Sequence, residues 1–127
     1  MDNGIQSIVS NHSVDDTVQS LKDLLQEKGV KLFALVDHSG EAKAAGLEMP
    51  PTKLLIFGNP KAGTPVMLSA PSAALDLPLK ILVSQQPDGI TLVSWNNPNW
   101  LQRRHNFSPE LVANLAAVEA FARKVTE

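Results

Sequence analysis

The stretch TKLLIFGNPKAGTPVM, residues 52–67, decides the fold, because it joins a strand to a helix through a tightly shaped corner. Its first part, 52–57, is apolar through its middle and predicts a central strand. Two glycines and a proline shape the turn at 58–64. Thr64 and Pro65 then predict the N-cap and the first position of a short helix.

Two long amphipathic helices are predicted on either side of this corner. The first has Ser13 as its N-cap and ends at Gly29, with apolar residues spaced three and four apart. The second is predicted as one continuous helix, with Ser108 as its cap and Pro109 at its first position. Its apolar stripe runs to Val125. Each helix therefore has one apolar face to bury.

Five segments of the chain have the composition of strands. They are residues 4–10, 31–38, 52–57, 79–84 and 90–95. The sequence Pro-Asp-Gly before the last segment predicts a hairpin, and a short helical turn and a loop are expected at 41–45 and 96–99. The order β-α-β-β-(short α)-β-β-α predicts an α+β fold, with a five-stranded, mainly antiparallel sheet and the two long helices on one face. At 127 residues we expect a single domain, with a core from about residue 4 to 125.

The charge balance excludes nucleic acid as a partner. Eleven lysines and arginines stand against thirteen acidic residues, which gives a formal charge of −2. A protein that binds a duplex needs a surplus of cations to displace counterions from the phosphates. The basic cluster at 103–105 is too short to follow a nucleic-acid backbone and is interpreted as a solvated surface segment.

The residues present also argue against a metal site, a bound cofactor and a membrane partner. The chain has no cysteine, and His12, His38 and His105 lack the paired spacing of a metal site, so neither a metal nor a cofactor is expected. The apolar runs are far shorter than a bilayer, and the first residues lack the pattern of a signal peptide. We therefore expect a cytoplasmic protein with no membrane partner.

The turn at 58–64 has the glycine spacing of a nucleotide-binding P-loop. A P-loop needs a lysine directly after its second glycine, and Thr64 stands there instead, so a nucleoside triphosphatase is excluded. Lys61 and the amides of Gly63 and Thr64 could still hold a carboxylate or phosphate at a helix start. The alternative is that the glycines only supply backbone angles that other residues avoid.

Asp37 and His38 stand at the end of a predicted strand, where ligands often meet a sheet. A carboxylate and an imidazole are the groups most used for proton transfer. Neighbouring strand residues point to opposite faces, however, so the two are not expected to form one catalytic dyad. The motif G-x-S-x-G is missing, which argues against a serine hydrolase of the nucleophile-elbow type.

Three stretches carry a resemblance to a known family: FGNPKAGTPVM at 57–67, ALDLPLKILV at 74–83 and the segment from 34 to 60. They resemble the bacterial and archaeal domain-of-unknown-function family 302. The resemblance implies a fold similar to the β-α-β4-α arrangement of the TATA-binding protein, and it implies no settled activity. The positions that match the family's pattern are Asp37, His38, Gly58, Asn59, Pro60, Gly63, Thr64 and Met67.

Three functions follow as hypotheses. The first is a non-enzymatic binding or sensing module that holds a small anionic ligand between His38 and the turn. Its candidate residues are Asp37, His38, Gly58, Asn59, Lys61, Gly63, Thr64 and Met67. The second is an enzyme that uses His38 as a general acid or base. The third is a structural protein that forms a homodimer through the uncovered face of its sheet or through the Trp95 region.

Overall fold

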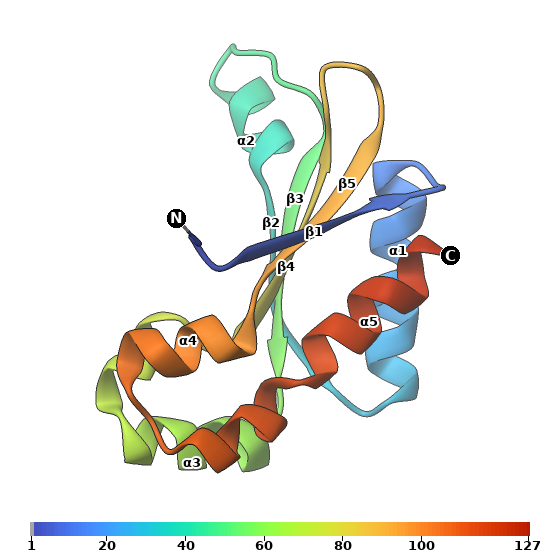
Figure 1. Cartoon of the computed structure of the whole chain (residues 1–127). Helices are drawn as coiled ribbons and strands as arrows, with labels where there is room; N and C mark the ends of the chain where they lie inside the picture. The colour runs from blue at the N-terminus through green and yellow to red at the C-terminus, as the bar shows by residue number, and fades with distance from the viewer. Residues whose placement is uncertain (1) are drawn as a thin grey trace.

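The computed structural model describes residues 2–127 and confirms the predicted α+β fold (Figure 1). Five strands form one sheet in the order β1-β5-β4-β3-β2, and all four neighbouring pairs are antiparallel. The strands are β1 (Ile5–Ser10), β2 (Lys31–Asp37), β3 (Thr52–Gly58), β4 (Leu79–Gln85) and β5 (Thr91–Asn96). The helices are α1 (Val14–Glu27), α2 (His38–Ala44), α3 (Pro60–Ser69), α4 (Pro98–His105) and α5 (Ala117–Thr126), with 3-10 helices η1 (Pro71–Leu75) and η2 (Pro109–Leu115).

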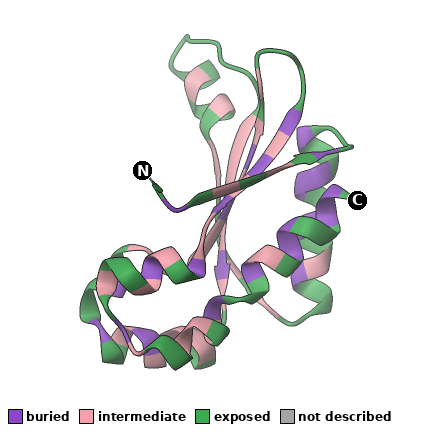
Figure 2. Ribbon diagram, in the orientation of Figure 1, coloured by how far each residue is buried: buried purple, intermediate pink, exposed green. Residues whose placement is uncertain are grey.

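The main core lies between the sheet and two helices, α1 and α5. Both helices contact the sheet and each other, and Figure 2 shows their buried residues turned toward it. Leu21, Phe57 and Val93 are fully buried there. Because side chains alternate along a strand, Leu54 and Leu82 point to the opposite face, where they are only half-buried. The two-helix, one-face arrangement predicted from the sequence is thus confirmed.

A second apolar cluster forms beyond one end of the sheet, among α3, η1, α4 and η2 (Figure 1). Phe107 is 1% exposed at its centre. The buried members are Val66, Ala70, Ala73, Leu101, Phe107 and Leu115. Leu79 packs against both clusters. The end of the sheet where β3 finishes and β4 begins therefore carries its own small apolar layer.

The helix after β3 begins earlier than the sequence predicted. Asn59, not Thr64, is its N-cap, and the Asn59 side chain accepts a hydrogen bond from the Lys61 amide at 2.9 Å. Pro60 occupies the first helical position, so Pro65 lies inside the helix. Because the pair Asn59-Pro60 already supplies a cap and a favourable first residue, the helix begins at Pro60 and not after Thr64.

Three further elements differ from the prediction. Residues expected as a loop start α4, which Asn97 caps through a 2.7 Å bond from the Asn99 amide. The final helix is broken into η2 and α5 at Ala116, and the Ser108 side chain makes no cap there. Strand β2 stops at Asp37, and His38 opens α2, because the Asp37 carboxylate caps that helix.

Candidate functional site

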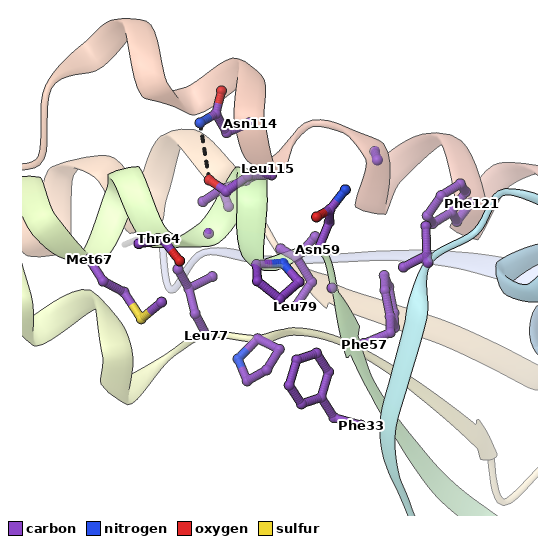
Figure 3. Close-up of a pocket in the computed structure, with 17 residues that line it drawn as sticks. Phe33, Phe57, Asn59, Thr64, Met67, Leu77, Leu79, Asn114, Leu115 and Phe121 are labelled. Atoms are coloured by element: carbon purple, nitrogen blue, oxygen red, sulfur yellow. Dashed lines mark hydrogen bonds between the residues drawn. The ribbon is translucent and has the colours of Figure 1, made fainter.

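An apolar cavity of about 410 Å³ lies where the two clusters meet, at the end of β3 (Figure 3). Phe57 and Phe121 come from the main core, with ring centroids 5.9 Å apart. Met67 and Leu115 come from the second cluster. The full lining is Val30, Phe33, Phe57, Gly58, Asn59, Pro60, Ala62, Gly63, Thr64, Met67, Leu77, Pro78, Leu79, Asn114, Leu115, Ala117 and Phe121.

No residue of this lining, all of it within the described chain, carries an ionisable side chain. Its polar side chains are Asn59, Thr64 and Asn114. The oxygen of Asn59 is used in capping α3, and the Asn114 amide donates to the carbonyl of Ala62 at 3.0 Å. What these two side chains still offer is therefore the Asn59 amide group and the Asn114 oxygen.

Gly63 leaves the α3 wall of the cavity open. A Cβ atom built on Gly63 would have the Met67 Cε atom, 3.9 Å away, as its nearest neighbour. That is an ordinary van der Waals contact, so a small side chain fits and a larger one would enter the cavity. Glycine is a poor residue for the middle of a helix. Its presence here is explained by the space that it leaves beside Met67.

Five of the eight residues singled out in the sequence line this cavity: Gly58, Asn59, Gly63, Thr64 and Met67. Lys61 is exposed and does not. The amide donors expected for an anion are engaged inside the helix, since the Gly63 amide bonds to the Asn59 carbonyl at 2.9 Å. The arrangement of amides predicted for a carboxylate or phosphate is therefore not formed.

Asp37 and His38 lie at the other end of the β2–β3 pair. The antiparallel register sets Lys31 opposite Gly58 and Asp37 opposite Lys53, so the two candidate regions are separated by the length of the strands. His38 is exposed and does not line the cavity. The structure therefore does not bring His38 and the turn together.

The Asp37 carboxylate serves α2. It accepts hydrogen bonds from the Ser39 hydroxyl at 2.7 Å and the Gly40 amide at 2.9 Å. These two bonds, the Ser39 hydroxyl first, lower the pKa of Asp37 below its usual value, because they stabilise the ionised form. A Cβ on Gly40 would lie 2.6 Å from an oxygen of this carboxylate. Asp37 is thus a helix cap in this structure.

Sequence reasoning missed the contribution of the C-terminal segment. Asn114, Leu115, Ala117 and Phe121 close one side of the cavity. The sequence predicts an apolar stripe along this segment, and no local pattern shows that the stripe faces a cavity. In the segment 103–105, Arg103 and Arg104 are exposed as expected, whereas the His105 side chain is only 4% exposed.

Neither a metal centre nor a membrane-spanning helix is found among residues 2–127. No group of three or more histidine, aspartate or glutamate side chains gathers in a way that could hold a metal ion among these residues. In the same range, none of the helices has both the length and the apolar character needed to cross a bilayer.

Comparison with known proteins gives one family and one fold. A family model described as "Domain of unknown function DUF302" matches residues 6–125. A solved structure, the uncharacterized conserved protein DUF302 from Bacillus stearothermophilus, superposes with a TM-score of 0.79. It shares 20% sequence identity and covers 98% of this chain and 97% of its own, which establishes the common fold.

The curated relatives that match are longer proteins. Proteins named fluoride-specific ion channel FluC 1, from Brucella suis biovar 1 and Brucella abortus biovar 1, are each 39% identical to this chain over 106 residues. The match covers 84% of this chain but 42% and 39% of those proteins. The chain thus spans about two fifths of their length. The name of ion channel was given to each of these longer proteins as a whole.

Proposed function

The chain belongs to the DUF302 family, and from that premise we propose that it binds a small, uncharged, mainly apolar molecule in the cavity between β3, α3 and η2. The observation that carries the proposal is the apolar lining of a cavity of about 410 Å³. Ligand pockets in proteins fall in the range of about 300–1,000 Å³ and combine apolar walls with a few polar groups. This cavity has both properties.

The charge of the ligand follows from the lining. A carboxylate or phosphate buried without a cationic partner costs several kcal/mol, on the order of the whole affinity of a weak ligand. Lys61 is the lysine of α3, and its exposed side chain does not line the cavity. The anionic ligand expected from the sequence is therefore replaced by an uncharged one.

Three neutral polar side chains would orient the ligand. The Thr64 hydroxyl can both donate and accept, the Asn59 amide group can donate, and the Asn114 oxygen can accept. A ligand with one hydroxyl, carbonyl or amide group and an apolar body satisfies this set. None of the three side chains transfers protons readily near neutral pH, which favours binding over acid–base chemistry.

The test uses a neutral fluorescent dye, N-phenyl-1-naphthylamine, whose emission rises in apolar surroundings. The Gly63→Leu variant projects a side chain into the cavity, and the Ala44→Leu variant adds the same side chain to exposed α2 at the other end of the sheet. We expect Gly63→Leu to lower dye affinity at least tenfold, while Ala44→Leu binds as the unmodified protein does. Equal binding by all three proteins would refute the site.

Competition between matched ligands tests the charge. Decanol and decanoate, at a pH where decanoate is ionised, differ mainly in the charge of the head group. We expect decanol to displace the dye at a concentration at least tenfold lower. Tighter binding of decanoate that is lost in Gly63→Leu would keep the site and reject the uncharged ligand.

A further inference from the structure

A second chemical constellation lies on the outer side of the second cluster, away from the cavity. His105 is the last residue of α4, and its Nδ1 atom lies 2.8 Å from the Ser72 hydroxyl oxygen. Its Nε2 atom lies 2.5 Å from Oδ2 of Asp76. None of the three residues lines the cavity. We propose that Ser72, His105 and Asp76 form a nucleophilic triad in which Ser72 reacts with activated esters and related acyl or phosphoryl electrophiles.

The neutral His105 ring carries one proton, and its two hydrogen-bond partners decide which nitrogen holds it. The ionised Asp76 carboxylate can only accept, so the Nε2 atom of His105 must donate to it. In the neutral imidazole the Nδ1 atom is then unprotonated, and it accepts a hydrogen bond from the Ser72 hydroxyl at 2.8 Å. Hydroxyl, base and carboxylate stand in the order that activates a serine in unrelated hydrolases, with the two ring nitrogens exchanged.

Local structure holds the three groups rigidly. Ser72 lies in η1, and Asp76 is the residue directly after η1. One short segment therefore presents both side chains to α4, which packs on η1. Arg104 Nη1 donates to both Asp76 oxygens at 3.3 and 3.0 Å and fixes the plane of the carboxylate. The His105 side chain is 4% exposed, which shields the ring from water. The base is therefore oriented before any substrate arrives.

The surroundings of Ser72 indicate the substrate class. Ser72 is exposed, so an electrophile can reach its hydroxyl from solvent. Residues three apart in a 3-10 helix eclipse each other, which places Leu75, 72% exposed, on the same side of η1. An ester with a short apolar acyl group could lie along this leucine. An open site of this kind suits good leaving groups such as phenolates.

The proposed reaction has two steps and needs only water as co-reactant. Ser72 Oγ bonds to the acyl carbon while its proton passes to His105 Nδ1, and the ester bond to the leaving group breaks as that proton is handed to the leaving oxygen. Water then attacks the acyl-serine, gives its proton to Nδ1, and releases the carboxylic acid. Ser72 regains its proton in the same step.

A fluorophosphonate tests the nucleophile directly. Its phosphorus forms a bond to Ser72 Oγ, and fluoride leaves with the serine proton. Peptide mass spectrometry of the full chain should find the label at Ser72, and Ser72→Ala should abolish it. Ser20, exposed on α1, serves as the comparison, and Ser20→Ala should label as the unmodified protein does. No label at Ser72, or equal labelling of Ser20, would overturn the proposal.

Asp76→Asn separates activation from a merely structural brace. The asparagine side chain can keep its oxygen toward Arg104 and donate its amide hydrogen to Nε2, which forces the ring proton onto Nδ1 and ends its role as a base. We expect the labelling rate to fall about 100-fold or more, the usual contribution of a general base, with a circular dichroism spectrum like that of the unmodified protein. His105→Gln should have the same effect. Labelling unchanged in both folded variants would contradict the triad.

Discussion

The two ends of the β2–β3 pair use the same capping device in different surroundings. At one end the Asp37 side chain caps α2, a helix with no buried residue. At the other end the Asn59 side chain caps α3, which buries Val66 completely and borders the cavity. The charged Asp37 cap lies on the exposed side of the molecule, where water solvates a carboxylate. The neutral Asn59 cap lies beside an apolar cavity, where a charge would be costly. The comparison shows that position, more than residue type, decides which candidate residue can meet a ligand.

The largest expected effect at the end of the sheet that carries the cavity comes from deleting Phe107, which is buried in the second cluster. Phe107→Ala should lower the free energy of unfolding by about 3–5 kcal/mol, the usual cost of deleting a buried phenylalanine. Urea denaturation measures this change. Leu68→Ala is the control, because Leu68 is 80% exposed on α3 and its loss should cost almost nothing. A small effect of Phe107→Ala would mean that the second cluster adds little stability.

Gly40→Ala tests the α2 end. Its Cβ would lie 2.6 Å from the Asp37 carboxylate, so the capping side chain must move away from the Gly40 amide. We expect a loss of about 0.5–2 kcal/mol in thermal unfolding, the usual cost of losing an N-cap, toward the lower value because the site is exposed. A variant as stable as the unmodified protein would show that the Asp37 cap can rearrange freely.

Gly63→Ala is the same substitution at the cavity end, and its effect should have the opposite sign. The added Cβ meets only Met67 Cε at 3.9 Å, and alanine is the better helix former. Stability should rise by up to about 1 kcal/mol, measured as a higher melting temperature. A decrease would indicate that α3 needs a glycine at this position for a reason other than space.

The smallest effect is the pH dependence of the α2 end. Because the pKa of Asp37 is lowered in the folded chain, its capping bonds contribute stability above the unfolded pKa, which is about 3.9, and lose it as pH falls through the lower folded value. The protection factor of the Gly40 amide, which compares its exchange rate with the intrinsic rate at the same pH, should therefore fall at acidic pH. Asp37→Asn retains a capping oxygen without the charge and should remove that dependence. The cavity end, whose lining holds no ionisable side chain among the described residues, should not change in this range.

The sequence predicted the sheet and α1 well, because both depend on local patterns. It missed the starts of α3 and α4 for one shared reason. The sequence analysis places Asn59-Pro60 in a turn and Asn97-Pro98 in a loop, yet each pair supplies an N-cap and a proline at the first helical position. An asparagine before a proline carries the same starting signal that was recognised at Thr64-Pro65.

The candidate site was only half predictable. Residues 58–67 attracted attention through their shape-setting glycines and prolines, and most of those singled out do line the cavity. The residues of the remaining walls are scattered along the chain between Val30 and Phe121, and only packing brings them together. The Ser72–His105–Asp76 cluster is similarly hidden, since Ser72 and His105 are 33 positions apart and no short motif joins them.

The edge position of β1 has a consequence for how the chain is made. β1 pairs only with β5, and the Ser7–Ser94 hydrogen bond joins positions 87 apart. On the ribosome, residues 5–10 emerge long before their partner strand exists. During synthesis β1 therefore cannot pair until β5 has emerged, and its exposed Ile5 and Val9 must be kept from other edges until then. Such a distant pairing also slows refolding of the full chain, because the connecting loop must close first.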